Sequence, residues 1–251
     1  MVRGVLLTSI VGSALLPGCS SGPALTPPRT LVAPYSGPAS EVTFAVVPLR
    51  NESGTSALDS LAVSDALVGR LAEVRGIDCV PLNRTLAVME AAGMDSVRSP
   101  AEAKELAGAL GVDALVLGSI TAYDPYDPPV LGLSLALYAP SGSLAVGDAE
   151  MLDTRRLTYQ PTDYDYFASM GVMADRPVSS LAEHLDARNH GVLMDLRMYA
   201  EGRSDRESAL GWRVYTRSMD RYTEFAVWHA VSGLMDREWI RVGGERVATG
   251  N

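Results

Sequence analysis

Short apolar runs alternate with helical patterns in the first half of the chain. Val42–Leu49 is a nearly continuous apolar run, which is typical of a strand buried on both faces. Apolar residues then recur at helical spacing over residues 57–74, and this pattern predicts a helix that packs one face on the sheet. We expect Gly76 to end this helix in a left-handed cap and Ile77–Pro81 to form a second short strand.

Two more helices and a third strand follow. Leu82–Ala92 has helical spacing, and Gly93 closes it. Ser99–Glu102 supplies an N-cap serine, a proline at the first helical position and a capping-box glutamate, which together predict a helix running to Leu110. Ala114–Ile120 is again an apolar run, and we predict that it forms the central strand of the sheet.

The pattern then changes from strand-like to irregular. Tyr123–Pro129 is rich in proline and acidic residues and is expected to be a loop that cannot pair in a sheet. Residues 130–138 and 144–153 have strand patterns on either side of Pro140–Gly142, and this spacing predicts a hairpin. Residues 154–190 show no periodicity, so we expect an irregular excursion there.

Helical spacing returns near Gly191 and continues, after an interruption, from about Tyr215 to Trp239. Residues after Val242 are expected to be frayed. The aromatic residues of the last helix are expected in the core, namely Tyr222, Phe225, Trp228 and Trp239. Trp228 lies off the face that Tyr222, Phe225 and His229 share, so it is the one to examine for another role.

These elements predict an α/β fold, in which helices flank a mixed sheet in three layers and a helical extension follows at the C-terminal end. The expected domain organisation has five parts, which are a signal peptide at 1–18, a tether at 19–40, the α/β domain at 41–153, the excursion at 154–190, and helices packing on the domain at 191–242.

The N-terminal residues have the pattern of a bacterial lipoprotein signal. Arg3 precedes the apolar run Val5–Leu16, which is too short to span a bilayer. Leu16–Cys19 resembles a lipobox, although Pro17 departs mildly from that pattern, and the resemblance implies that Cys19 becomes the acylated first residue of the mature chain. The alternative is an ordinary cleaved signal followed by an unmodified cysteine.

A segment rich in serine, glycine and proline follows Cys19 and is expected to be an extended tether. Ser20, rather than an aspartate, follows the cysteine. Under the sorting rule of enterobacterial lipoproteins, this implies an anchor in the outer membrane, with the protein facing the periplasm.

Three segments resemble one known family of envelope domains. The first is Phe44–Gly54, a strand and turn in which Leu49 replaces the usual phenylalanine. The second is Leu110–Ile120, in which an aspartate precedes an apolar strand that ends in Gly-Ser. The third is the expected hairpin Leu133–Ala149. Their order and spacing resemble the periplasmic α/β domain shared by the curli secretion lipoprotein CsgG, the penicillin-binding-protein activator LpoB and the N-terminal domain of TolB. The resemblance covers about residues 40 to 153. It implies a non-catalytic domain that binds protein partners or self-assembles.

Composition and charge restrict the partners. The formal net charge of −9 argues against nucleic acid and anionic lipid surfaces. With Cys19 acylated, Cys79 is the remaining cysteine of the two, so no intrachain disulfide is expected, and Cys79 is interpreted as a small buried hydrophobe.

The sequence contains no phosphate-binding loop, nucleophile elbow, zinc helix or dinucleotide fingerprint. We therefore predict no enzyme activity, no cofactor and no metal. His184 and His190 could approach Asp186, but solvated or core histidines are preferred to a metal site. Four acids lie close to tyrosines in the sequence, namely Asp124, Asp127, Asp163 and Asp165. They could contact calcium or a glycan, but the preferred interpretation is that they are solvated loop acids.

The leading hypothesis is a membrane-anchored envelope lipoprotein that acts as an adaptor or assembly factor and binds envelope proteins, with homo-oligomerisation left open. An oligomeric secretion channel resembling CsgG is the alternative. That role needs membrane-crossing hairpins, and only Leu131–Tyr138 alternates as such a strand does. An envelope hydrolase with an unrecognised site is the third hypothesis.

Overall fold

The computed structural model describes residues 30–35, 42–139, 144, 176–201, 203–204 and 208–249, with the backbone alone for 244–249. Its centre is a six-stranded mixed sheet in the order β3-β1-β4-β5-β6, with β2 paired to the far part of β4. β1 runs parallel to β3 and β4, whereas β5 runs antiparallel to both β4 and β6. The strands are β1 (Val42–Val46), β2 (Arg50–Asn51), β3 (Ile77–Val80), β4 (Ala114–Asp124), β5 (Val130–Tyr138) and β6 (Ser179–Asp186).

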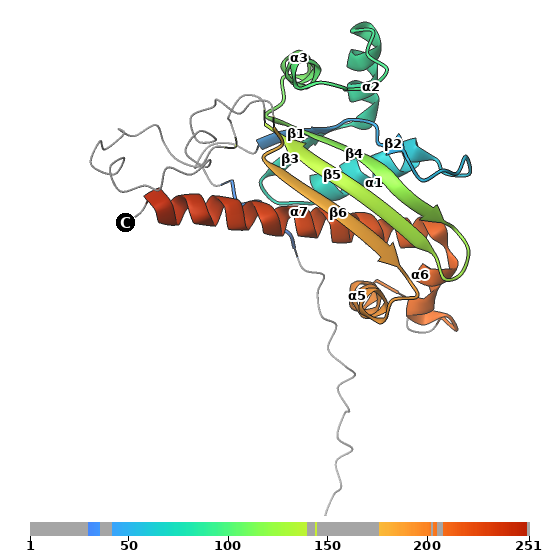
Figure 1. Cartoon of the computed structure of the whole chain (residues 1–251). Coiled ribbons are helices and arrows are strands. Elements are labelled where there is room, and N and C mark those ends of the chain that lie inside the picture. The colour runs from blue at the N-terminus through green and yellow to red at the C-terminus, as the bar shows by residue number, and fades with distance from the viewer. Residues whose placement is uncertain are drawn as a thin grey trace, which may run out of the picture.

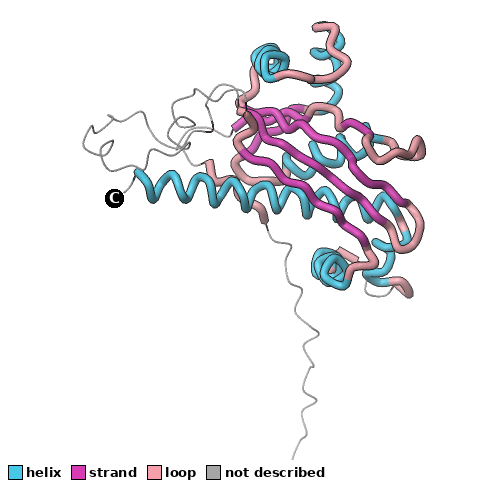
Figure 2. Tube along the Cα trace, viewed as in Figure 1, coloured by secondary structure: helices cyan, strands magenta, loops and turns pink. Residues whose placement is uncertain are grey.

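Helices cover both faces of the sheet (Figure 1), so the predicted three-layer α/β fold is confirmed. α1 and α7 pack on one face, while α2 and α3 pack on the other face near β1 and β4. Figure 2 shows the long C-terminal helix running beside the strands. The helices are α1 (Ser60–Ala72), α2 (Leu82–Ala91), α3 (Pro100–Leu110), α5 (His190–Ala200), the 3-10 turn η1 (Gly211–Arg213), α6 (Val214–Arg217) and α7 (Met219–Thr249).

β4 is the central strand, as predicted. Leu115 is fully buried in the core under α2 and α3, while its neighbours Ala114 and Val116 are fully buried in the core under α1 and α7. A strand with apolar residues at consecutive positions is what burial on both faces requires. Gly118 allows the closest approach, because a Cβ there would lie 2.3 Å from the carbonyl oxygen of Ser134 on β5.

The ends of two helices follow from their capping residues. Ser99 Oγ accepts a hydrogen bond from the Glu102 N–H at 3.2 Å, Pro100 begins α3, and Gly111 ends it at a φ of 68°. Helix α1 begins later than expected because Asp59 caps it by accepting from the N–H groups of its first turn. Gly76 has the left-handed φ of 92°, but it lies in the turn into β3 rather than at the end of the helix.

The sheet differs from the expected hairpin. β5 pairs with β6, which comes from the stretch expected to be irregular, and the remaining predicted partner at 144–153 lies outside the described residues except for Leu144. Along β6 only Leu181 and Leu185 are buried toward α7. The other inward positions are occupied by Ser179 and Glu183. Because these two residues are polar, the sequence does not show the apolar–polar alternation that indicates a strand.

β4 also continues further than expected. Tyr123 and Asp124, predicted to begin a loop, pair with Leu131 and Val130 of β5. The turn of the β4–β5 hairpin is therefore confined to residues 125–129. The same pairing places β5 in the interior of the sheet, with Leu131 and its alternate leucines buried in the core under α7. This strand, the one on which the channel alternative depended, is thus part of the domain's own core.

The C-terminal helix also exceeds its expected bounds. α7 continues through Thr249 rather than fraying after Val242. Its fully buried positions recur at helical spacing over Tyr222, Ala226, Ala230 and Leu234, on the side that faces α1, β5 and β6. Contact with β6 is close at Gly233, where a Cβ would lie 3.3 Å from the methyl carbons of Leu181. Among the described residues, no helix combines the length and apolarity needed to cross a bilayer.

Candidate binding pocket

The segment before β1 docks against the domain, although residues 19–40 were expected to be a free tether. Val32 forms a parallel bridge with Arg75. The Ala33 N–H donates to the Arg75 carbonyl at 2.9 Å, and the Arg75 N–H donates to the Leu31 carbonyl at 3.0 Å. Trp239 Nε1 of α7 donates to the Val32 carbonyl at 2.8 Å. Residues 30–35 are therefore bound between the α1–β3 turn and α7.

A fully buried carboxylate holds the end of this segment. Glu238 of α7 is 0% exposed and accepts hydrogen bonds from the Tyr35 hydroxyl at 2.7 Å and from the Ser179 hydroxyl. Arg241 donates to the same carboxylate through Nε at 2.9 Å and Nη2 at 2.5 Å. One side chain thus joins the N-terminal segment, strand β6 and the C-terminal helix.

The charge state of this cluster follows from its partners. Burial acts to raise the pKa of Glu238, but hydrogen bonds from Arg241 and Ser179, with the charge of Arg241, hold the pKa below its ordinary value. Burial and then the charge of Glu238 raise the pKa of Tyr35. The carboxylate is therefore ionised and the phenol neutral around pH 7, which is the combination that their hydrogen bond requires.

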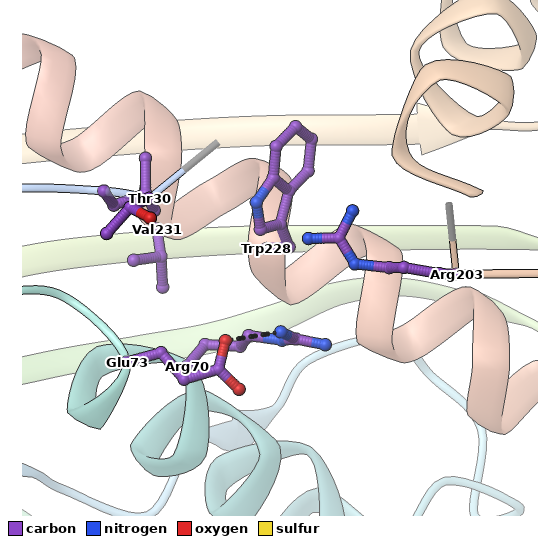
Figure 3. A pocket seen from close by; sticks show the side chains of 7 residues that line it. Thr30, Arg70, Glu73, Arg203, Trp228 and Val231 are labelled. Carbon is purple, nitrogen blue, oxygen red and sulfur yellow. Dashed lines mark hydrogen bonds and ion pairs between the residues drawn. The ribbon is translucent and has the colours of Figure 1, made fainter. Parts of the chain in front are cut away.

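A cavity of about 260 Å³ lies where the docked segment meets α1 and α7. Figure 3 shows the guanidinium ends of Arg70 and Arg203 and the Trp228 ring around the same open space. The lining comes from four separate parts of the chain, and its residues are Thr30, Leu31, Arg70, Glu73, Arg203, Trp228 and Val231.

Tyr199 of α5 organises the two arginines. Arg70 donates through Nη2 to the Tyr199 hydroxyl at 2.7 Å and through Nη1 to the Glu73 carboxylate at 2.7 Å. The Arg203 guanidinium lies 4.3 Å from the Tyr199 ring centroid and donates through Nη1 to the Tyr199 carbonyl at 2.7 Å. Within the part of the chain that the structure describes, Arg203 makes no ion pair.

The tyrosine is itself fixed by aromatic packing. Tyr199 is 1% exposed, and its ring centroid lies 5.0 Å from that of Trp228, 5.7 Å from Phe225 and 5.6 Å from Tyr215. Burial raises the pKa of Tyr199, against the opposing charges of Arg70 and Arg203. The phenol therefore stays neutral and adds no negative charge beside the two arginines.

The charges and apolar surfaces indicate the chemistry of the pocket. Arg70 and Arg203 supply two positive charges, and Glu73 neutralises one of them, so the described residues of the lining have a net charge of +1 in a chain of net charge −9. Leu31, Val231 and the Trp228 ring provide the apolar part of the wall. Such a surface suits a singly charged anion that is joined to an apolar group.

The residues singled out by sequence lie elsewhere, except for Trp228. Cys19 lies outside the described residues, so its acylation stays a prediction. Tyr222 and Phe225 are buried in the core as predicted, but the prediction was wrong for Trp239, which is 42% exposed and contacts the docked segment. Trp228 is half-buried and lines the cavity. Cys79 is buried, and burial raises the pKa of its thiol to about 12, which confirms it as a small hydrophobe.

The histidines are separated. His184 lies on β6 opposite Gly132, and His190 begins α5. His229 Nε2 lies 3.7 Å from the Asp195 carboxylate. Among described residues, no three His, Cys, Asp or Glu side chains are grouped as a metal would require.

The acids that were considered for calcium pair with arginines where they are described. Asp124 lies 3.7 Å from Arg188, and Asp127 lies 2.7 Å from Arg217. Asp163 and Asp165 lie outside the described residues. Asp127 is an exposed acid of the turn, as the preferred interpretation predicts, whereas Asp124 is the partly exposed last residue of β4 rather than a loop residue.

Comparison with known proteins adds only a general likeness. No protein-family model and no curated protein matches the sequence. The LpoB C-terminal domain from Salmonella enterica is 12% identical with a TM-score of 0.39, covering 60% of this chain and 86% of that one. Lipoprotein GNA1162 from Neisseria meningitidis is 15% identical with a TM-score of 0.39, covering 62% of this chain and 92% of that one. The hypothetical protein CT253 from Chlamydia trachomatis is 11% identical with a TM-score of 0.35, covering 84% of this chain and 100% of that one. All three TM-scores are below 0.5, so none of these likenesses indicates a function for this chain.

Proposed function

We propose that the protein is a non-catalytic cell-envelope lipoprotein, anchored in the outer membrane through acylated Cys19, which binds protein partners in the periplasm. The observation that carries this proposal is the pocket, which is lined by two arginines and a tryptophan, with the buried Tyr199 holding both arginines in place. These residue types provide most of the binding energy in protein interfaces, particularly where they line a concave and partly dry site.

The position of the pocket supports the same function. Its wall includes Thr30 and Leu31, which belong to the docked segment that follows the proposed anchor. Ten residues separate Cys19 from Thr30, so an extended linker would reach at most about 40 Å. A partner bound in the pocket would therefore be held close to the membrane that carries the lipid.

Anchoring and partner binding are tested separately. For anchoring, wild-type protein and Cys19→Ala are labelled with an alkyne fatty acid in the native bacterium, and membranes are separated by density. We expect label and outer-membrane recovery for the wild type only. Label that persists on Cys19→Ala would contradict the anchor.

For partner binding, the lipidated protein is crosslinked in cells, purified and analysed by quantitative mass spectrometry. The variants compared are Arg203→Gln, in the pocket, and Arg84→Gln. Arg84 is an exposed arginine on α2, so its replacement makes the same change of charge outside the pocket. We expect a periplasm-facing protein that is depleted with Arg203→Gln and retained with Arg84→Gln. Equal recovery of every captured protein with the two variants would contradict a role for the pocket.

A further inference from the structure

We propose that the pocket binds a carboxylate carried on an apolar peptide segment of the partner. This inference rests on the proposed function and names the chemistry that the same site recognises. The carboxylate is either an acidic side chain or the C-terminal group of a chain, because both present the same planar anion to a guanidinium.

The net charge of the site favours a ligand that carries one negative charge. Arg70 is already bound to Glu73 at 2.7 Å, with the Glu73 side chain 66% exposed and that of Arg70 18% exposed. Arg203 has no such carboxylate among the described residues. One uncompensated guanidinium matches one carboxylate, whereas a doubly charged phosphate would leave a negative charge without a partner.

The geometry of Arg203 suits a planar anion. Its guanidinium lies on the Tyr199 ring and is fixed by one hydrogen bond to the Tyr199 carbonyl. A guanidinium has five N–H donors in a rigid fork, so donors remain for a carboxylate after that bond is made. Because Tyr199 is buried and held by Arg70 and by neighbouring rings, the fork is ordered before any ligand arrives.

The apolar wall and the size of the cavity point to a peptide. Leu31, Trp228 and Val231 offer contact to an aliphatic or aromatic group beside the anion. A cavity of about 260 Å³ lies just below the range of drug-sized ligand sites and has room for one residue. Because the chain has a net charge of −9, a lipid surface with many negative charges is repelled more strongly than a peptide that carries one, so a protein is the better source of the carboxylate.

The test uses the full lipidated chain in nanodiscs of neutral phosphatidylcholine, with empty nanodiscs as the blank. Binding is measured by saturation-transfer NMR on the probe. The probes are acetyl-Leu-Glu-Leu-amide, its neutral glutamine counterpart, acetyl-Leu-Leu with a free C-terminal carboxylate, and glycerophosphoglycerol, which is an anionic lipid headgroup without its acyl chains.

We expect at least one carboxylate peptide to bind about tenfold or more tightly than the neutral peptide, which is the ratio that one charge-assisted hydrogen bond supplies. Arg203→Gln should weaken the binding of that peptide by a similar factor, and Arg84→Gln should leave its affinity unchanged. The two carboxylate peptides distinguish a side-chain from a C-terminal carboxylate.

The proposal is overturned if neither carboxylate peptide binds more tightly than the neutral peptide. This comparison uses the wild-type protein alone, so it does not depend on whether a variant folds. Tighter binding of glycerophosphoglycerol, or an unchanged affinity in Arg203→Gln, also overturns it. If these results occur while partner capture still depends on Arg203, the ligand class is wrong and the proposed function stands. If carboxylate peptides bind but no partner is captured, the proposed function is wrong, while the assignment of the pocket as a carboxylate-binding site is supported.

Discussion

Replacement of Glu238 by glutamine should destabilise the domain strongly. The carboxylate is 0% exposed and receives hydrogen bonds from Tyr35, Ser179 and Arg241. Glutamine keeps the size of the side chain but removes the charge. Arg241, whose side chain is only 19% exposed, then loses the charge of Glu238, and the new amide group must find its own partners inside the protein.

Breaking a buried ion pair by removing one charge costs about 3–5 kcal/mol. In a domain of this size, each kcal/mol lowers the melting temperature by roughly 2–4 °C. Glu238→Gln should therefore melt about 6–20 °C below the wild type. Glu73→Gln is the matched control, since Glu73 also pairs with an arginine three residues away but its side chain is 66% exposed. That change should cost at most about 1 kcal/mol.

The pH dependence gives an independent check. The pKa of Glu238 is lower in the folded protein than its ordinary value of 4.5, because hydrogen bonds and the charge of Arg241 outweigh the effect of burial. The stability that the carboxylate contributes is therefore fully present above about pH 4.5 and is lost as the pH falls through the folded pKa. The difference between wild type and Glu238→Gln should narrow below that pH.

Thermal melts followed by circular dichroism from pH 3 to pH 8 measure both effects. The reasoning would be refuted if Glu238→Gln melted within about 2 °C of the wild type at pH 7. It would also be refuted if Glu73→Gln were the more damaging change, because burial would then not determine the cost.

Further substitutions test other parts of the account. Leu115→Asp places an unpaired charge in the central strand and should cost several kcal/mol, about 3 or more, in denaturant melts; a midpoint equal to the wild type would show that β4 is not central. Gly118→Ala should cost about 1–3 kcal/mol in the same melts, because its Cβ would lie 2.3 Å from the Ser134 carbonyl oxygen, whereas Gly108→Ala, with open space around the added carbon, should be neutral or stabilising. Tyr35→Phe should cost about 1 kcal/mol and increase hydrogen exchange at Ala33, and unchanged exchange would mean that Glu238 does not hold the docked segment.

The sequence was sufficient for the elements that have a strong local signal. The apolar strand β1, the capped helix α3 and the central position of β4 all follow from residues within or next to the element. The mixed sheet between helices follows from their order. Local signals of this kind depend on a few neighbouring residues, and in these elements the tertiary structure agrees with the local preference.

β6 was missed because its stability comes from distant parts of the chain. Ser179 and Glu183 occupy two of its inward positions, where an apolar pattern would have revealed the strand. Ser179 is accepted there because Glu238, which is 59 residues away, receives its hydrogen bond. The docking of residues 30–35 likewise depends on distant residues, namely Arg75 and, at the other end of the chain, Glu238 and Trp239.

The pocket had one visible signal in the sequence. Trp228 lies off the buried face of α7, and an aromatic residue in that position indicates a second contact. Nothing local distinguishes Arg70 or Arg203 from other surface arginines, because their significance comes from Tyr199, which is 129 residues from Arg70. Convergence of this kind is a property of the tertiary structure.

Site-specific photo-crosslinking is the most direct test of partner binding through the pocket. A photoreactive p-benzoylphenylalanine is placed in the lipidated protein at position 30, on the exposed rim of the pocket, or at position 86, on the exposed surface of α2. Irradiation of living cells should give a discrete protein adduct from position 30 that disappears when Arg203→Gln is added, and no such adduct from position 86. An adduct that survives Arg203→Gln, or that forms equally from position 86, would contradict the claim that this pocket binds the partner.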